Sequence, residues 1–259
     1  AELLKIEPQA KRWIKKFLEK KKKMNAKERW CLWLAGATEE DLRGMPIVQK
    51  RVEAVRVFRL ASTKENTVKR AEIPHLFDQD RQPTSGSYIL MPRVSSERRT
   101  YVPLGFYSVD VISSDRNFIL PNGSLYEFGV LSSLIHNDWM RLVAMRLKSD
   151  YSYGNKVVYN TFPWPTASIA QQTEIERIAE ELLLTREDYP GKTLAELYDP
   201  DKMPAGLLEA HRALDSAVDK LYRDRPFKDA AERVSHLLGL YEKINAATPW
   251  PALTTIQQR

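Results

Sequence analysis

The sequence predicts an α+β fold, in which a region of mixed helices and short strands precedes an all-helical C-terminal region. Three observations support this prediction. Between residues 87 and 121, β-branched and aromatic residues alternate with polar ones, and Pro and Gly interrupt the runs. Residues 125–147 carry apolar side chains at helical spacing. Every periodic pattern after residue 166 is helical.

The first 62 residues are predicted to be largely helical. Apolar residues between positions 8 and 24 recur at helical spacing among lysines, which indicates a helix that is either a solvated connection or a basic strut beside a phosphate backbone. The helical pattern continues over residues 26–62. Thr38, followed by three acidic residues, predicts a helix N-terminus. Pro46 predicts the first turn of a second helix that ends near Ser62.

The remaining elements follow from the same patterns. Strands are predicted at 87–95, 98–106, 118–121 and 157–159. Helices are predicted at 125–147, 168–187, 194–199, 204–223 and 227–245. The segment 160–165 is stiff because Pro163 and Pro165 fix the backbone, and it predicts a domain boundary. The chain is thereby divided into residues 1–25, 26–165 and 166–259.

The composition limits the class of protein. The chain has 259 residues, with 40 Lys and Arg against 34 Asp and Glu, and a formal net charge of +6. This basic excess is compatible with nucleic acid, an anionic membrane surface or an acidic partner, and it does not choose among them. No apolar run approaches the roughly 20 residues of a membrane-spanning helix, so no membrane partner is expected. A single cysteine, Cys31, and the lack of a secretory segment favour a reducing, cytoplasmic setting.

No catalytic constellation is recognisable in the sequence. The four histidines (75, 136, 211 and 236) are scattered, and His136 is interpreted as structural. The patterns GxxxxGK[ST], GxGxxG and GxSxG do not occur. Asn160–Trp164 lacks the adjacent prolines of the Asn-Pro-Pro-aromatic motif of amino-methyltransferases, and Pro200-Asp201 lacks the partner strand of a nuclease metal site. No catalytic residue, metal or cofactor is therefore assigned to this chain.

The most informative segment is 146–156, which follows the predicted helix at 125–147. In extended backbone alternate side chains point the same way, so Lys148, Asp150 and Ser152 would share one side. A Lys can donate to O6 and N7 of guanine in the major groove, and an Asp can accept from N4–H of the paired cytosine. The two residues could therefore read one G·C pair. The alternative is an exposed Lys–Asp ion pair, worth about 0–1 kcal/mol.

Hydroxyl and basic side chains gather in two further segments. Arg, Ser and backbone amide groups are the usual contacts to DNA phosphates. The candidate phosphate contacts are Arg93, Ser95, Ser96, Arg98 and Arg99. A second polar group spans 113–117 and includes Asp115 and Arg116. The alternative for both segments is an ordinary polar hairpin surface.

Five long segments carry a family resemblance. They are KERWCLWL (27–34), MPIVQKRVEAVRVFRLAS (45–62), MPRVSSERRTYVPLGF (91–106), LYEFGVLSSLIHNDWMRLVAMRLKSDYSY (125–153) and VVYNTFPWP (157–165). Together they resemble the MmeI-like, or type IIL, restriction–modification enzymes, which join a nuclease, an adenine-N6 DNA methyltransferase and a target recognition domain in one polypeptide. The resemblance covers about residues 25–245. It implies that 26–165 are the target recognition domain, 166–259 a helical C-terminal region, and 1–25 a helical connection from the methyltransferase domain.

The resemblance also implies roles for particular residues. In this family base-reading residues lie in the segment that corresponds to 148–152 and in the loop before 118–121. Here these positions hold Lys148, Asp150, Ser152, Asp115 and Arg116. The Lys-x-Asp pair is similar to the family's guanine-reading variant beside the methylated adenine, and Arg116 with Ser152 could read another pair. SAM and Mg²⁺ would belong to the rest of the parent chain, whose methyltransferase and nuclease domains would be partners of this part.

The expected function is sequence-specific recognition of double-stranded DNA. This module would direct methylation and cleavage by a type II restriction endonuclease and adenine-N6 DNA methyltransferase, and it is not expected to be catalytic by itself. Two alternatives stay open. The chain could be a basic protein-interaction module, or a self-contained DNA methyltransferase or nuclease, which detectable SAM binding by this chain alone would support.

Overall fold

The structure, a computed structural model, describes residues 2–18 and 29–247. The chain divides into two compact units. The first consists of residues 1–85 and 108–114, and the second of residues 86–107 and 115–259. The fold is α+β, as predicted, with short strands and with helices alone after residue 167 among the described residues.

The first unit combines a three-stranded sheet with short helices. Its elements are α1 (Glu2–Ile6), η1 (Pro8–Trp13), β1 (Ile14–Leu18), β2 (Arg29–Leu32), α2 (Glu39–Arg43), α3 (Pro46–Leu60), α4 (Glu65–Lys69), η2 (Arg70–Glu72) and β6 (Val111–Ser113). β1 lies between antiparallel β2 and parallel β6. The buried core of this unit consists of Ala10, Leu34, Met45 and Val48.

Two predicted helix starts are confirmed in the first unit. The Thr38 hydroxyl accepts a hydrogen bond from the Asp41 amide at 3.1 Å, and the Asp41 carboxylate accepts from the Thr38 amide at 2.9 Å. These two bonds satisfy amides that the first turn of α2 leaves without helical partners. Pro46 is the first residue of α3, which ends at Leu60.

The helix predicted over residues 8–24 is wrong for 14–18, which form β1, and residues 19–24 lie outside the described part. Residues 29–32 were also expected to be helical and form β2. Over so short a run, a mixed apolar and lysine pattern is compatible with either structure. The strand partners determine that residues 14–18 form a strand. β6 supplies hydrogen bonds from far along the chain, and Asp110, next to β6, forms an ion pair with Lys15.

The second unit contains two three-stranded sheets and the longer helices. Its elements are β3 (Ser87–Pro92), β4 (Val94–Ser95), β5 (Gly105–Ser108), β7 (Asn117–Pro121), α5 (Leu125–Ser132), α6 (Leu134–Val143), β8 (Met145–Leu147), β9 (Asp150–Ser152), η3 (Asn155–Tyr159), α7 (Ile169–Glu187), α8 (Leu194–Leu197), α9 (Ala205–Tyr222) and α10 (Ala230–Ala247). The strand orders are β5-β3-β7 and β4-β9-β8.

Three predictions fail in this unit. Of the strand expected at 98–106, only Gly105 and Phe106 lie in a strand, β5, and residues 98–104 form turns and irregular backbone. Residues 145–147, expected to end a helix, form β8. The single helix expected at 125–147 is interrupted at Ser133, whose backbone is extended and whose buried hydroxyl donates to the Val130 carbonyl at 2.6 Å. The strand expected at 157–159 is instead a turn of π-helix, with the Asn160 amide bonded to the Asn155 carbonyl at 2.8 Å. Burial of Val158 outweighs the strand preference of two adjacent valines.

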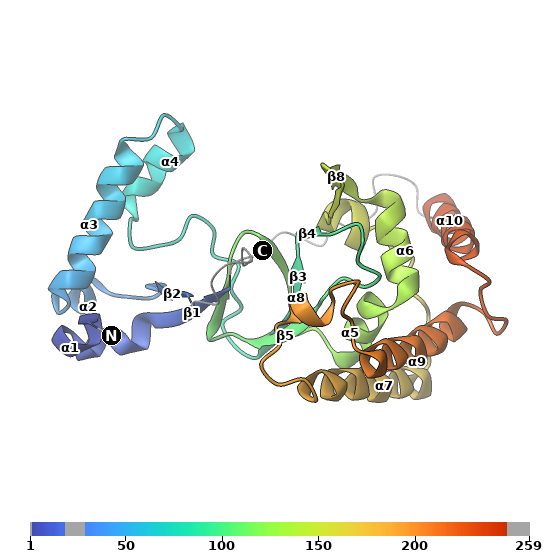
Figure 1. Ribbon diagram of the computed structural model, residues 1–259. Coiled ribbons are helices and arrows are strands. Elements are labelled where there is room, and N and C mark those ends of the chain that lie inside the picture. The colour runs from blue at the N-terminus through green and yellow to red at the C-terminus, as the bar shows by residue number, and fades with distance from the viewer. Residues whose placement is uncertain (1, 19–28, 248–259) are drawn as a thin grey trace. The chain divides into compact units, whose positions relative to one another are not determined.

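The C-terminal helices share a core with the elements before them. Figure 1 shows α7 and α9 side by side, next to α5. Phe128 on α5, Ile175 on α7 and Leu214 on α9 are buried in one cluster with Trp139 of α6. The helical region is therefore part of the same compact unit as the β8–β9 hairpin. Among the helices described, none is long and apolar enough to cross a membrane.

Candidate nucleic-acid interface

The segment expected to read DNA forms a tight hairpin. β8 and β9 are antiparallel, with Leu147 opposite Asp150, so Lys148 and Ser149 form a two-residue turn. The expectation of extended backbone throughout 148–152 is wrong at Lys148, which has a φ of +58°. Within β9 the expected alternation holds: Tyr151 is buried, and Asp150 and Ser152, on the opposite face, are partly exposed. Lys148 is thus exposed at the tip, beside Asp150.

The main chain of Arg93 joins the hairpin to the second expected reading segment. Its amide donates to the carbonyl of Arg116 at 2.9 Å, and its carbonyl accepts from the amide of Tyr153 at 2.8 Å. Asp115 and Arg116 form an exposed turn directly before β7. The structure therefore brings the 115–116 turn and the end of β9 together through one residue. The Arg93 guanidinium lies over the Phe118 ring, 4.6 Å from its centroid.

The five expected phosphate contacts have different surroundings. Ser95 is 4 % exposed, and its hydroxyl has no hydrogen-bond partner within the described chain. Arg98 forms an ion pair with Asp201 at 2.8 Å. Arg99 is half-buried and donates to the Tyr198 carbonyl at 3.2 Å, and its burial lowers the pKa of its guanidinium. Arg93 and Ser96 are half-exposed, and neither is in an ion pair with another described residue.

Arg146 is a residue of this site to which the sequence reasoning gave no role. It is directly opposite Tyr151 in the hairpin, and its guanidinium carbon lies 3.9 Å from the Tyr151 ring centroid. It also donates to the carbonyl of Ser149 in the turn at 2.8 Å and lies 3.5 Å from Glu97. The spacing of Arg146 and Tyr151 would have indicated that they pair across the hairpin. This inference requires the position of the two-residue turn, which the sequence does not show.

His136, interpreted above as structural, lies in the core of the second unit. His136 is buried, with its ring nitrogens 3.0 Å from the Leu131 carbonyl and 3.1 Å from the Tyr153 hydroxyl. Burial lowers the pKa of His136 to about 4, so the ring is neutral at pH 7. His136 thus contacts Tyr153, the residue that follows β9. Within residues 2–18 and 29–247, no three His, Cys, Asp or Glu side chains are placed to hold a metal ion.

Comparison with known proteins places this geometry in a family. Residues 1–166 match the family model of the MmeI target recognition domain. Residues 167–248 match that of the MmeI C-terminal domain. The chain belongs to the MmeI family.

Two relatives of known name show how much of such a protein this chain represents. It is 38 % identical to DNA methyltransferase A of Bacillus subtilis (strain 168) over 237 residues, which are 92 % of this chain and 27 % of the relative. It superposes with a TM-score of 0.88 and 39 % identity on the type IIL restriction–modification enzyme MmeI, solved in complex with DNA, covering 95 % of this chain and 33 % of that one. The chain thus spans about a third or less of these relatives.

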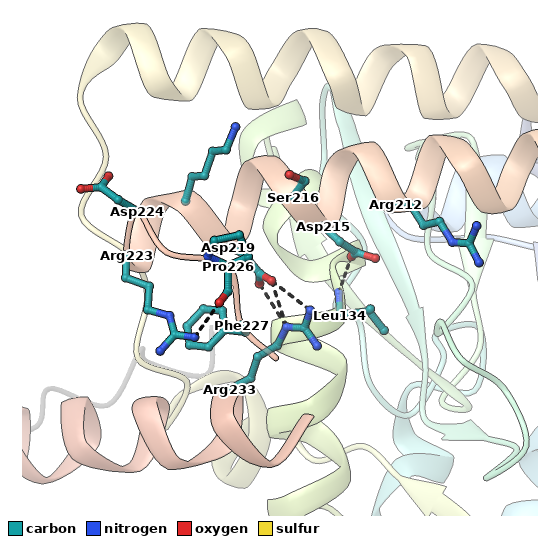
Figure 2. A pocket seen from close by; sticks show the side chains of 11 residues that line it. Leu134, Arg212, Asp215, Ser216, Asp219, Arg223, Asp224, Pro226, Phe227 and Arg233 are labelled. Atoms are coloured by element: carbon teal, nitrogen blue, oxygen red, sulfur yellow. Dashed lines mark hydrogen bonds and ion pairs between the residues drawn. The ribbon is translucent and has the colours of Figure 1, made fainter. Parts of the chain in front are cut away.

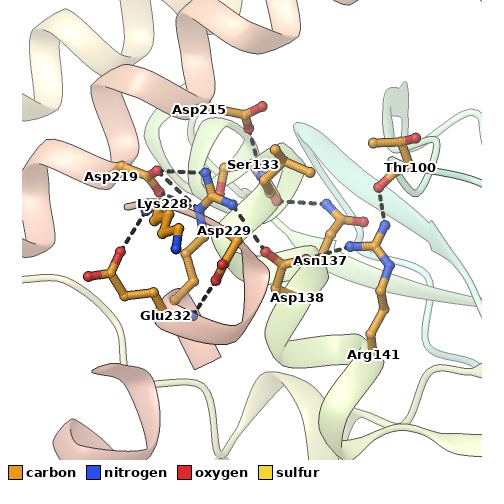
Figure 3. Close-up of polar contacts among 12 residues, drawn as sticks. Thr100, Ser133, Asn137, Asp138, Arg141, Asp215, Asp219, Lys228, Asp229 and Glu232 are labelled. Atoms are coloured by element: carbon orange, nitrogen blue, oxygen red, sulfur yellow. Dashed lines mark hydrogen bonds and ion pairs between the residues drawn. The ribbon is translucent and has the colours of Figure 1, made fainter. Parts of the chain in front are cut away.

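Side chains on both sides of residue 166, where the first MmeI family model ends, form one polar joint, shown in Figure 3. Asp138 on α6 accepts from Arg141 at 2.7 Å and pairs with Arg233 of α10 at 3.4 Å. Arg233 also binds the carboxylate of Asp219 on α9 at 2.9 Å. Arg141 in turn donates to the carbonyl of Thr100. The MmeI C-terminal domain therefore holds α6, the helix that leads directly into the β8–β9 hairpin.

A shallow pocket of about 260 Å³ lies beside this joint, between α9 and the start of α10 (Figure 2). Its lining carries charges of both signs. Asp219 and Arg233 bind each other there, and Asp215 accepts from the Leu134 amide at 2.6 Å and from the Tyr101 hydroxyl at 2.6 Å. Asp215, Asp219 and Arg233 are held in these contacts, so this part of the lining belongs to the joint.

Proposed function

We propose that this chain is the sequence-reading module of a type IIL restriction–modification enzyme, and that it directs adenine methylation and cleavage by domains on the rest of the same polypeptide. Residues 26–165 would form the target recognition domain, residues 166–259 its helical support, and residues 1–25 the connection to the methyltransferase domain. The match to the MmeI target recognition domain and the DNA complex of the solved relative support this proposal. The formal net charge of +6 agrees with a polyanionic partner.

The observation that carries the proposal is the conformation of Lys148 next to Asp150. A lysine with positive φ costs on the order of 1 kcal/mol or more, and such strain concentrates at functional sites. Glycine would suit this turn better if only the fold mattered. The chain instead places a long cation at an exposed hairpin tip, two residues before a half-exposed carboxylate.

The proposed division of labour follows from this geometry. Lys148 donates to O6 and N7 of a guanine, and Asp150 accepts from the amino group of the paired cytosine. Arg116 and Ser152, joined through Arg93, read a neighbouring pair, with Asp115 beside them. A two-stranded ribbon is narrow enough to enter the major groove of B-DNA, which is about 12 Å wide.

The phosphate contacts divide into direct and indirect ones. Arg93 and Ser96 are proposed to contact the DNA backbone. Ser95, Arg98 and Arg99 act indirectly, because burial or bonds to the segment around α8 occupy them. SAM and Mg²⁺ are assigned to the rest of the parent polypeptide, where the methyltransferase and nuclease domains are proposed to lie. Cytoplasmic DNA is the expected partner.

The test exchanges the charges of the reading pair. The double variant Lys148→Glu, Asp150→Arg of the complete natural polypeptide keeps the net charge, and the sequences that it methylates are determined by sequencing modified DNA. We expect a changed base preference at one position only. The control Lys220→Glu, Asp224→Arg makes the same exchange at exposed residues of the C-terminal region and should leave the methylated sequence unchanged. An identical methylated sequence for the Lys148 and Asp150 variant would refute the base-reading role.

The two alternatives make different predictions. A self-contained methyltransferase would bind SAM as this chain alone, which isothermal titration of the 259-residue chain would detect. A protein-interaction module would bind an acidic protein partner, and salt-sensitive binding to duplex DNA with no protein partner would exclude it. The sequence-reading module should bind duplex DNA with an affinity that falls steeply with salt and should not bind SAM.

A further inference from the structure

The reading face of the hairpin carries two apolar residues in addition to the polar ones. In an antiparallel pair, residues directly opposite each other point to the same side of the sheet. Met145 is opposite Ser152, and Leu147 is opposite Asp150. Met145 and Leu147 therefore share a face with both polar reading residues of β9. Tyr151 and Arg146 point to the other face, where Tyr151 is buried.

Both apolar side chains are exposed to an unusual degree. Met145 is 71 % exposed and Leu147 is 56 % exposed. They lie on β8, which is the edge strand of the sheet β4-β9-β8. Exposed edge strands are usually protected by charged side chains or by proline, because apolar ones invite pairing with other chains. Two apolar side chains alternating along such a strand indicate a surface that is covered when the hairpin is engaged.

We propose that Met145 and Leu147 are apolar base readers, which contact the C5 methyl group of a thymine in the major groove next to the pair read by Lys148 and Asp150. This inference rests on the proposed function. The thymine methyl is the apolar group that base pairs present in the major groove, and it is recognised by apolar side-chain contact.

The surroundings of the two side chains favour DNA over a protein as the covering partner. The exposed ammonium group of Lys148 is at the same hairpin tip, directly after Leu147. A cation beside an apolar surface matches a DNA groove, in which phosphates flank the base edges. Met145 and Leu147 are directly opposite Ser152 and Asp150 on the same face of the hairpin. All four side chains would therefore contact DNA when this face enters the groove.

The test removes the methyl group from the DNA. The complete natural polypeptide is titrated with duplexes that contain its methylated sequence and the flanking pairs, in which each thymine is replaced in turn by uracil. We expect one uracil substitution to weaken binding by about fourfold, the effect of one buried methyl-sized group. Leu147→Ala or Met145→Ala should weaken binding to the thymine duplex and abolish the difference between thymine and uracil at that position.

Leu142→Ala is the matched control, because Leu142 is also an exposed apolar residue, 47 % exposed on α6, but is not on the hairpin. It should keep the uracil effect, and equal melting temperatures of the three variants would show that folding is intact. The inference is overturned if no uracil substitution matters, or if the uracil effect persists in both hairpin variants. If the natural protein shows no sequence preference at all, the proposed function is rejected instead.

Discussion

The guanidinium of Arg146 lies over the ring of Tyr151, 3.9 Å from the ring centroid, and donates a hydrogen bond to the carbonyl of Ser149 at 2.8 Å. One side chain thus links the two strands of the hairpin to its turn. Because Lys148 precedes Ser149 in that turn and has a positive φ, Arg146 holds the proposed guanine reader in its position. Tyr151 is itself fixed by burial, so the contact between Arg146 and Tyr151 is anchored in the core.

Replacing Arg146 with alanine should loosen the turn and relax base preference at the pair read by Lys148 and Asp150. A cation–π contact of this kind is worth about 1 kcal/mol, or roughly fivefold in affinity for the preferred sequence. The measurement is the ratio of dissociation constants for preferred and altered duplexes. Arg146→Lys keeps the charge but loses the planar group that stacks and donates, so it should show most of the defect. An equal loss for all duplexes, with a salt slope lower by about one, would identify Arg146 as a phosphate contact instead.

Removing the guanidinium of Arg233 should destabilise the second unit. Arg233→Met leaves the carboxylates of Asp219 and Asp138 without a shared partner, and both are almost fully buried. Breaking one partner of such a pair costs about 3 kcal/mol, because a buried charge is left uncompensated. Urea denaturation would show this as a lower midpoint.

Arg177→Met is the matched control for this change. Arg177 also binds two acidic residues, Glu174 and Glu181, but its side chain is 53 % exposed. Solvent screens such surface pairs, so we expect little or no change in the denaturation midpoint. Equal effects of the two substitutions would contradict the role of the joint.

Asp215 should make the stability of the folded chain depend on pH. Burial, opposed by hydrogen bonds from Tyr101 and Leu134, raises the pKa of Asp215 from 3.8 to about 7. Between these two values the folded state holds a proton that the unfolded state has lost. The free energy of unfolding contributed by Asp215 therefore falls as the pH rises from about 4 to about 7, by up to about 4 kcal/mol.

The variant Asp215→Asn isolates this contribution, because an amide can still accept from the Leu134 amide and donate to the Tyr101 oxygen. The difference in stability between the variant and the natural protein should grow from pH 5 to pH 8 in favour of the variant. His136 and His211 act in the opposite direction, since burial lowers the pKa of each and acid must charge them. Because both proteins keep these histidines, their effect cancels in the difference. A constant difference across this range would show that Asp215 stays charged in the fold.

Gly129 should be intolerant of a side chain. A Cβ atom at this position of α5 would lie 2.6 Å from Cγ2 of Ile175 on α7, closer than real Cβ atoms approach. Gly129→Ala should therefore cost about 1–3 kcal/mol through overpacking. At Gly239 on α10 a Cβ atom would meet no other atom within 4 Å, so Gly239→Ala should instead stabilise by about 0.5–1 kcal/mol. Thermal unfolding of both variants distinguishes packing from helix propensity.

The candidate site was predicted in part. Lys148, Asp150 and Ser152 could be named from the sequence because their spacing and chemistry are local. The turn at Lys148 could not be predicted, because an extended strand and a two-residue hairpin give nearly the same sequence pattern over five residues. The buried position of Ser95 and the partners of Arg98 and Arg99 depend on α8 and the residues around it, about a hundred positions away in the sequence.

Local signals in the sequence account for the α+β class, the helix starts at Thr38 and Pro46 and the helical C-terminal region, because capping groups, proline rings and helical periodicity act within a few residues. Contacts made on folding explain why residues 14–18 form a strand and how Arg93 joins the two proposed reading segments, because both depend on hydrogen bonds to distant residues. At the helix break at Ser133, the next amide, that of Leu134, donates to the distant carboxylate of Asp215. Strand pairing and burial are settled by such distant partners, whereas helix ends are settled by neighbours along the chain.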